Sequence, residues 1–311
     1  MSRLSPSHFL SLADHTDEDI RRYIYLSRMV KLNPTGFRSA CTGKTLAMLF
    51  LKPSLRTRVS FQAGIFQLGG QGLYLGPTDI QLHRGETVAD TARVLSRYVD
   101  GIMARMYTHR DMLDLARYAS VPVINGLTDF NHPCQVLADL LTIDERFGRL
   151  QGLKIAYIGD GNNMAHSLLH GCARMGMHVA VGHPRGYAPD PDVVTCARQL
   201  AARTGGSILI TEDPTEAAQE ADVIYNDVWT SMGQEEEARQ RLAHFDGFQV
   251  NNALMKHARP SAIFMHCLPA HRGEEVAAEV IDGPQSVVMD QAENRLHAQK
   301  AILVHLMGER F

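Results

Sequence analysis

A serine, a threonine and two arginines follow directly on an apolar run in the stretch "FLKPSLRTRVSF", residues 50–61. Ser54 is placed to cap a helix that runs to the glycine pair at 69–70. The N-terminus of a helix offers N–H groups and about half a positive charge, which favours an anion. Arg56 and Thr57, in the first turn, add a guanidinium and a hydroxyl donor. The stretch predicts a site for a doubly charged anion; the alternative is an ordinary capped helix with solvated arginines.

Two further apolar runs in the first half end in hydrogen-bonding side chains. Arg105 ends the run "GIMAR", which is otherwise apolar. In "NHPCQ", Pro133 suits the first position of a helix, so His132 takes the cap and Gln135 the first turn. These groups predict donors for a small polar moiety beside the anion. The alternatives are a salt-bridging arginine, a capping histidine and a surface glutamine.

The second half places a different set of groups where apolar runs stop, in "NDVWTSMG" and "HCLPAHR". Asp227, Ser231 and Cys267 bring a carboxylate, a hydroxyl and a thiol to one rim, which suits an amino-acid substrate. The alternatives are that Asp227 only caps a turn and that Cys267 is an inert core residue. Trp229, the single tryptophan, is expected to pack in the core.

The segment "IGDGNN" invites comparison with a dinucleotide-binding turn. Its third glycine is replaced by Met164, and the next apolar run ends in "VGHP" with no acidic residue for a ribose. The chain also lacks a G-x-S-x-G elbow and HExxH spacing. We therefore expect no nicotinamide cofactor, no hydrolase of the Ser-His-Asp type and no catalytic metal.

Short apolar runs alternate with amphipathic stretches along the chain, and these elements must position the groups above. The alternation predicts an α/β fold of mainly parallel sheets flanked by helices. Ligands of such sheets bind beyond the carboxyl ends of the strands. The alternation restarts after about Leu150, which indicates two domains, at 1–148 and 149–289. A last helix within 290–311 is expected to return to the first domain. Further helices are predicted at 16–33, capped by Thr16, and at 88–99, with Val99 on its apolar face.

Composition bounds the class of protein. The 311 residues are 45% hydrophobic and carry a formal net charge of −3, which gives no pull toward nucleic acid or an anionic membrane. No apolar run is long enough to span a bilayer, and the start lacks the apolar centre of a signal peptide. The five cysteines are scattered without a CxxC pair, so we expect reduced thiols and a cytoplasmic protein.

Taken together, the segments "KPSLRTR", "ARM", "HPCQ", "GDGNN", "DVWTSMG", "HCLP" and "ENRLHAQKA" make the chain resemble the aspartate/ornithine carbamoyltransferase family. They run in family order from about Phe50 to Ile302 and cover most of the chain. Within the family, "SMG" and "HCLP" point to ornithine as the acceptor. One position departs from the pattern, because Leu55 stands where the family motif S-T-R-T-R has a threonine. Only the backbone of Leu55 can then serve the anion.

The resemblance implies transfer of a carbamoyl group from carbamoyl phosphate to the side-chain amine of L-ornithine, giving L-citrulline and phosphate, without a cofactor. It implies that carbamoyl phosphate is bound by Ser54, Leu55, Arg56, Thr57, Gln81, Arg105, His132, Gln135, Cys267, Leu268 and Arg295. It implies that ornithine is bound by Asn163, Asp227, Ser231 and Met232. The catalytic roles fall to Arg105, His132, Asp227 and Cys267, the first two as donors to the oxyanion.

The resemblance also implies a homotrimer with shared active sites, in which Gln81 reaches into a neighbour's carbamoyl phosphate site. N-acetylornithine and putrescine are the alternative acceptors within this class. From other classes, a nicotinamide dehydrogenase and a non-catalytic amino-acid-binding protein are the competing interpretations.

Overall fold

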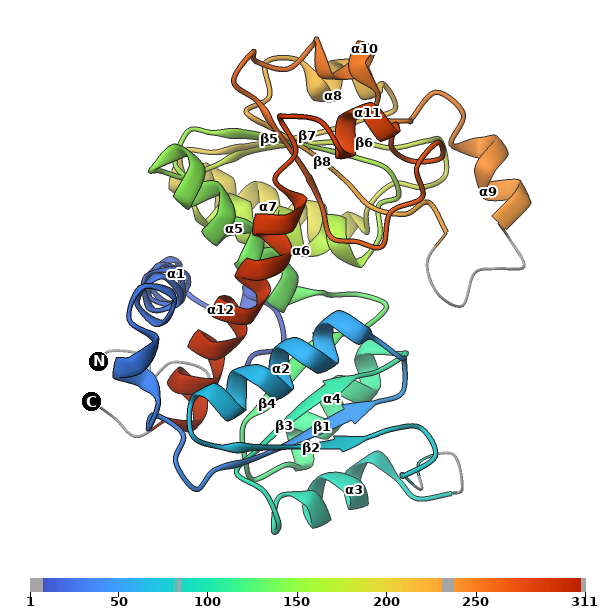
Figure 1. Ribbon diagram of the computed structural model, residues 1–311. Coiled ribbons are helices and arrows are strands. Elements are labelled where there is room, and N and C mark those ends of the chain that lie inside the picture. Colours follow the sequence, from blue (N-terminus) through green and yellow to red (C-terminus); the bar gives the residue numbers. More distant parts are fainter. Residues whose placement is uncertain (1–7, 81, 83–84, 231–237, 309–311) are drawn as a thin grey trace. The chain divides into compact units, whose positions relative to one another are not determined.

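The computed structural model describes residues 8–80, 82, 85–230 and 238–308 (Figure 1). The contacts between residues divide the chain into two units: the first is Met1–Leu141 with Asn294–Phe311, and the second is Thr142–Glu293. The boundaries between the two units fall inside the helices α5 (Pro133–Phe147) and α12 (Val288–Met307). The sequence pattern predicts domain boundaries after residues 148 and 289.

The first unit is built on a four-stranded parallel sheet with strand order β2-β1-β3-β4. Strand β1 is buried along almost its whole length, as expected of a parallel strand covered on both faces. With α5 and α12, its elements are η1 (Leu12–Asp14), α1 (Asp17–Leu32), η2 (Pro34–Phe37), β1 (Thr45–Phe50), α2 (Leu55–Gln67), β2 (Gln71–Leu75), α3 (Val88–Leu95), β3 (Gly101–Arg105), α4 (His109–Tyr118) and β4 (Val123–Leu127).

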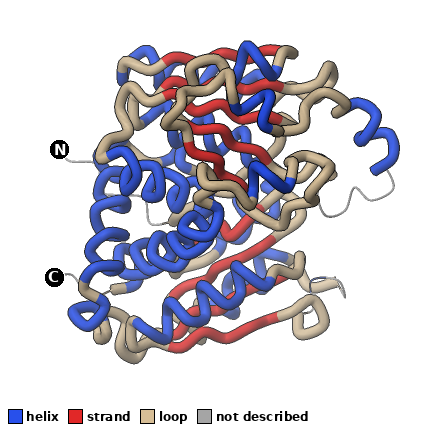
Figure 2. Tube along the Cα trace, turned by 45° about the horizontal axis from the view of Figure 1, so that its top comes forward, coloured by secondary structure: helices blue, strands red, loops and turns tan. Residues whose placement is uncertain are grey.

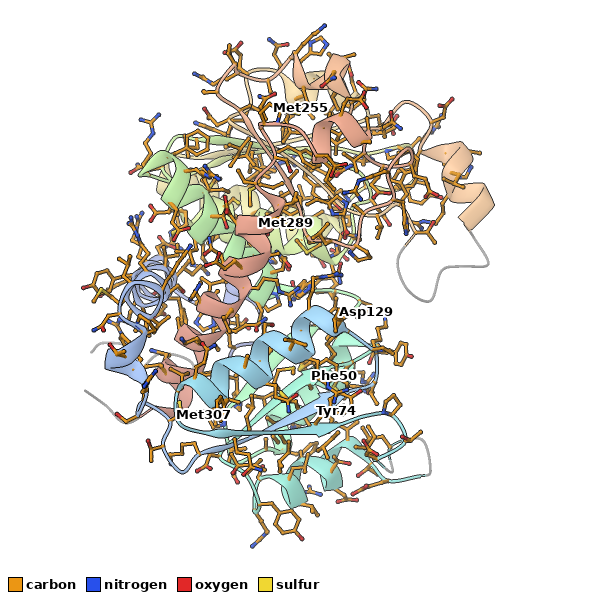
Figure 3. The ribbon with its side chains drawn as sticks, viewed as in Figure 1. Phe50, Tyr74, Asp129, Met255, Met289 and Met307 are labelled. Carbon is orange, nitrogen blue, oxygen red and sulfur yellow. The ribbon has the colours of Figure 1, made fainter. Side chains whose placement is uncertain are left out.

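Helices cover both faces of this sheet. On one face, α3 and α4 bury apolar side chains such as Ala92 and Met112 against Ile102 of β3. On the other face lies α2 (Figure 1). Helix α2 packs on α12, and a Cβ at Gly64 would come within 3.2 Å of the Lys300 side chain. Phe50 and Tyr74, labelled in Figure 3, lie with their ring centroids 5.4 Å apart at the ends of neighbouring strands.

The second unit contains a five-stranded parallel sheet with strand order β7-β6-β5-β8-β9. Helices again lie on both sides of the strands (Figure 2), with α6 and α7 on one face and α8, α10 and α11 on the other. Its elements are β5 (Lys154–Ile158), α6 (Asn163–Arg174), β6 (His178–Gly182), α7 (Pro191–Thr204), β7 (Ser207–Thr211), α8 (Pro214–Ala218), β8 (Val223–Asn226), α9 (Ala238–His244), α10 (Asn252–Met255), β9 (Ile263–His266) and α11 (Ala278–Ile281).

The predicted α/β class is confirmed, and the local signals explain why. Thr16 and Asp19 form the reciprocal capping box at the start of α1, and Ser54 caps α2. The prediction of a helix to residue 99 was wrong, because α3 ends at Leu95. Val99 is nevertheless buried, which is why its apolar side chain fitted the helical pattern. Among the described helices, none has the length and apolar character needed to cross a membrane.

Helix α6 carries a buried histidine that makes the stability of the second unit depend on pH. Burial lowers the pKa of His170 to about 4, and the neighbouring His166 and Arg174 add to the effect. The unfolded chain therefore binds more protons than the folded one below about pH 6.5. Keeping His170 neutral therefore costs no stability above about pH 6.5. The free energy of unfolding falls as the pH is lowered from 6.5 toward 4.

We expect the free energy of unfolding to drop by about 2 kcal/mol between pH 7 and pH 5 from this group alone. Urea denaturation of His170→Leu at the two pH values should show a correspondingly smaller drop than the natural protein. The exposed His257→Leu serves as the control and should keep the full drop. Equal drops in all three proteins would contradict this assignment.

Candidate active site

The start of α2 forms an anion cradle in the first unit. The Ser54 hydroxyl oxygen accepts from the Thr57 backbone N–H at 3.2 Å, and the hydroxyl donates to Thr57 Oγ1 at 3.0 Å. Nε of Arg56 is buried without a hydrogen-bond partner among the described residues. The first N–H groups of a helix have no acceptor within the helix, so these donors suit an oxyanion. The Leu55 side chain is 77% exposed, which leaves its backbone as the part that belongs to the cradle.

Arg295 of α12 connects this cradle to the start of α5. Its guanidinium donates to Thr57 Oγ1 at 2.8 Å and to Gln135 Oε1 at 3.0 Å. The Gln135 amide in turn donates to Asp139 Oδ1 at 2.9 Å. Arg295, Gln135 and Asp139 are all buried, so these bonds fix the side chains in place before any ligand arrives.

His132 and Arg105 stand beside this chain of hydrogen bonds. The His132 carbonyl accepts the first backbone bonds of α5, as expected of a capping residue. Burial holds the pKa of the His132 imidazole well below its usual range, and Arg295, Arg105 and Arg56 lower it further. A neutral imidazole surrounded by three guanidinium groups acts as a hydrogen-bond donor or acceptor and not as a cation. Arg105 is 4% exposed at the end of β3, where the register with β4 shifts.

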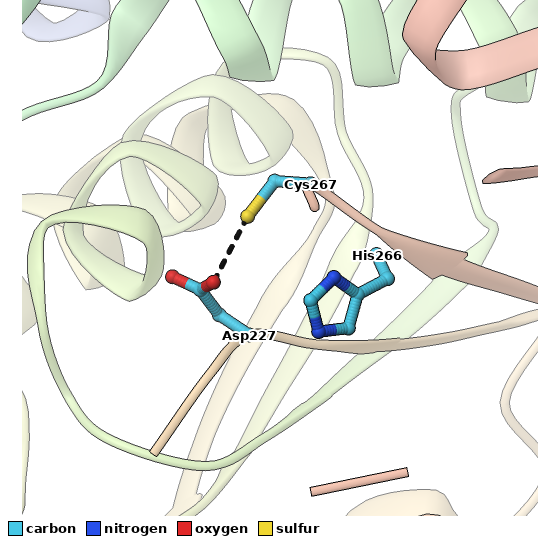
Figure 4. Close-up of side chains that lie close together, drawn as sticks. All are labelled: Asp227, His266 and Cys267. Carbon is cyan, nitrogen blue, oxygen red and sulfur yellow. Dashed lines mark hydrogen bonds between the residues drawn. The ribbon is translucent and has the colours of Figure 1, made fainter. Parts of the chain in front are cut away.

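In the second unit, the ends of β8 and β9 bring Asp227 and Cys267 together (Figure 4). The Cys267 thiol donates to Asp227 Oδ1 at 3.0 Å, and the same oxygen accepts from the Val228 backbone N–H at 2.8 Å. Asp227 is buried, whereas Cys267 is half-buried. Asn163 is the first residue of α6, which follows the end of β5, the strand beside β8. A carboxylate, a thiol and an amide therefore lie at the carboxyl ends of strands of one sheet.

The loop after β9 is held in an uncommon conformation that the sequence did not reveal. Leu268 has φ +59°, in the left-handed region that a leucine rarely adopts. Its backbone N–H donates to Nδ1 of the buried His266 at 2.9 Å, so the imidazole proton lies on Nε2. That nitrogen faces Glu275 Oε1 at 3.4 Å, and Gln291 accepts from the His266 backbone N–H at 2.9 Å. Histidine and carboxylate residues spaced like these are too common in a sequence to be recognised.

The turn "GDGNN" has a structural explanation for its glycines. Gly159 has φ +149°, and a Cβ at Gly161 would come within 2.2 Å of the Pro189 backbone nitrogen. The Gly161 backbone N–H donates to the Tyr187 carbonyl at 2.8 Å. The close approach that removes the side chain at 161 is therefore to the protein's own backbone. A dinucleotide is not needed to account for it.

Three predicted site residues, Gln81, Ser231 and Met232, lie outside the described residues. Among the others, the structure joins Ser54, Thr57, Gln135 and Arg295 through hydrogen bonds. It places Arg56 and Arg105 close enough to the neutral His132 to lower the pKa of its imidazole. It also joins Asp227 with Cys267.

These two sets of groups are those of a group-transfer enzyme: one set suits a phosphate leaving group and an oxyanion, the other a charged amino acid. A family model for the carbamoyl-P binding domain of aspartate/ornithine carbamoyltransferase matches residues 7–145. A second, for the Asp/Orn binding domain, matches residues 151–306. The chain therefore belongs to the aspartate/ornithine carbamoyltransferase family.

Similar proteins agree with this membership. An ornithine carbamoyltransferase of Thermococcus kodakarensis is 61% identical over 96% of this chain and 96% of its own length. The anabolic ornithine carbamoyltransferase of Pyrococcus furiosus is 57% identical over 98% of each chain. A solved structure of the Pyrococcus furiosus ornithine carbamoyltransferase superposes with a TM-score of 0.95 at 56% identity, over 99% of each chain.

Proposed function

We propose that the protein is an ornithine carbamoyltransferase, which converts carbamoyl phosphate and L-ornithine to L-citrulline and phosphate. The observation that carries the proposal is the preorganised chain from Ser54 through Thr57 and Arg295 to Gln135, set beside a neutral His132. The relatives described above share this activity by name.

The first unit is proposed to bind carbamoyl phosphate. The phosphoryl group lies at the N-terminus of α2, where Ser54, Arg56, Thr57 and the Leu55 backbone donate to it, and charge-assisted bonds of this kind contribute about 1.5–3 kcal/mol each. Arg105, His132 and Gln135 hold the carbamoyl group, and Arg295 fixes Thr57 and Gln135 relative to each other. As the amine attacks, Arg105 and the neutral His132 stabilise the charge on the carbonyl oxygen.

The second unit is proposed to bind ornithine through Asn163, Asp227, Ser231 and Met232. Cys267 and Leu268 are proposed as further ligands of the carbamoyl group. The attacking amine has a pKa of about 10.4 in water, so it must lose a proton before it can attack. The carbamoyl carbon then bonds to nitrogen, its bond to the phosphate oxygen breaks, and phosphate leaves with the electron pair. The ammonium proton passes to solvent before the attack, and the proton that the nitrogen sheds after the attack passes to the departing phosphate.

The buried Asp227 carboxylate favours ornithine over the alternative acceptors. A charged α-amino group can pair with it, whereas the amide of N-acetylornithine carries no charge. Putrescine has an amine but no α-carboxylate for the remaining donors. The anabolic relative from Pyrococcus furiosus supports a biosynthetic direction toward arginine. A cytoplasmic location stays a prediction, supported by the five free cysteines.

We also propose that the chain forms a homotrimer with shared active sites. Supporting this, the outward face of α2 presents Leu55, Val59 and Phe66, which are 77%, 54% and 77% exposed, next to the edge strand β2. An apolar stripe on the helix that carries the anion cradle suits burial against a second copy of the chain.

We expect Phe66→Glu to dissociate the oligomer and to raise KM for carbamoyl phosphate, because a charge cannot be buried in an apolar contact. Sedimentation velocity gives the assembly state and steady-state kinetics the KM. Tyr98→Glu, at a residue 75% exposed outside α2, is the control and should change neither. A fully active Phe66→Glu monomer would contradict the shared-site proposal.

The reaction itself is tested by following both products. Carbamoyl phosphate and L-ornithine together should give citrulline and phosphate in a one-to-one ratio, well above the hydrolysis seen without ornithine. Phosphate release at the same rate with and without ornithine would indicate a phosphatase. A protein that binds both substrates and releases neither product would indicate a non-catalytic binding protein.

A further inference from the structure

Arg241, in α9, makes a set of buried contacts that the proposed reaction does not use. Its guanidinium forms an ion pair with Asp160, in which the two side chains are only 5% and 14% exposed. Its Nε donates to the Trp229 carbonyl at 2.6 Å. The guanidinium also lies over the rings of Tyr187 and Phe245, at 4.8 and 5.5 Å from their centroids.

These contacts are unusual for a surface helix such as α9. Arg272, in the same unit, pairs with Asp282 at 2.7 Å while the two side chains are 48% and 55% exposed. Exposed pairs of that kind contribute little, whereas removing one partner of a buried pair leaves a charge without compensation. Consistent with this, burial raises the pKa of Asp160, and the Arg241 guanidinium opposes that shift. The Arg241 guanidinium thus offsets the cost of burying the Asp160 carboxylate.

The two partners of Arg241 lie in the two loops that carry the ornithine-binding side chains. Asp160 is in the turn after β5, three residues before Asn163 at the start of α6. Trp229 follows β8, two residues after Asp227. Trp229 is itself buried against Phe245, with ring centroids 5.5 Å apart, so its carbonyl is a fixed acceptor. A single side chain therefore bridges the turn after β5 and the loop after β8.

We propose that Arg241 is a positioning residue for the ornithine site. By holding Asp160 and the Trp229 carbonyl at once, its guanidinium fixes Asn163 relative to Asp227, and so sets the spacing of the groups that receive the ends of ornithine. Its planar fork makes both bonds simultaneously, which the single ammonium of a lysine does less well. The inference rests on the proposed function, because it assigns Asn163 and Asp227 to ornithine.

The test compares steady-state kinetics of citrulline formation in the natural protein, Arg241→Met, Asp160→Asn and the double variant. We expect Arg241→Met to raise KM for ornithine about tenfold, the size of effect transmitted through such contacts. KM for carbamoyl phosphate, whose proposed ligands are mostly in the first unit, should stay within about twofold. The double variant should regain part of the ornithine affinity, because it no longer buries an unpaired carboxylate.

Asp160→Asn and one control variant keep the result interpretable. Asp160→Asn preserves shape and leaves an amide oxygen as acceptor, so it tests the bridge even if Arg241→Met does not fold; we expect about a threefold rise in KM for ornithine. Arg272→Met, the matched arginine of an exposed pair, should leave both KM values unchanged. Unchanged ornithine affinity in folded Arg241→Met or Asp160→Asn, or equal rises for both substrates, would overturn the inference. A natural protein that makes no citrulline would overturn the proposed function, and this inference with it.

Discussion

Replacing Arg105 by methionine is expected to lower kcat for citrulline formation by about 10²–10³-fold, the usual cost of losing one donor to an oxyanion. Arg105 is nearly fully buried at the end of β3, and it lies close enough to His132 to lower the pKa of its imidazole. In the proposed transition state its guanidinium donates to the carbonyl oxygen as negative charge develops there. Because this charge is absent from the bound substrates, the loss falls on kcat more than on KM for ornithine.

The matched control for this prediction is Arg93→Met. Arg93, on α3, pairs with Asp90 at 3.0 Å while 57% of its side chain is exposed. Its replacement should leave kcat within about twofold, because it removes a surface contact and no substrate donor. A folded Arg105→Met with normal kcat would remove Arg105 from the oxyanion site. An equal loss of kcat in both variants would indicate a general loss of folding rather than the loss of a specific donor.

Replacing Asp227 by asparagine is expected to raise KM for L-ornithine by about 10- to 100-fold, which corresponds to the loss of a charge-assisted hydrogen bond. The substitution preserves shape, and the amide oxygen can still accept from the Cys267 thiol, as the carboxylate does at 3.0 Å. It removes the negative charge that is proposed to pair with the α-amino group of ornithine.

KM for carbamoyl phosphate should change by no more than about twofold in this variant, because it leaves the proposed phosphate ligands Ser54, Arg56 and Thr57 unaltered. Asp282→Asn, which removes a carboxylate from an exposed pair with Arg272 in the same unit, provides the control. An Asp227→Asn protein with unchanged KM for ornithine would contradict the role of Asp227. A protein that instead gained activity with uncharged amines would reassign the acceptor.

Local patterns in the sequence predicted much of this structure. The capping residues Thr16 and Ser54 mark the starts of α1 and α2, because each side chain satisfies an N–H that the helix itself leaves unpaired. Apolar runs of strand length predicted the parallel strands. Since chemistry in such sheets gathers where strands end, Arg105, Asp227 and Cys267 could be singled out from their positions alone.

Contacts between distant segments could not be predicted in this way. Arg295 binds Gln135 and Thr57, which lie 160 and 238 residues away along the chain, and no local period reports such a pairing. Glu275 and Arg241 were missed for the same reason. Each resembles an ordinary surface residue in sequence, and each becomes distinctive only when folding buries it.

The measurement that tests the central claim most directly is an assay for the ureido product with four acceptors side by side. Purified protein and carbamoyl phosphate are offered L-ornithine, N-acetyl-L-ornithine, putrescine and L-aspartate, and kcat/KM is determined for each. We predict that L-ornithine exceeds each of the others by about 10²-fold or more, because a buried charge left unpaired is strongly disfavoured. A higher kcat/KM for any other amine, or no product with all four, would contradict the account.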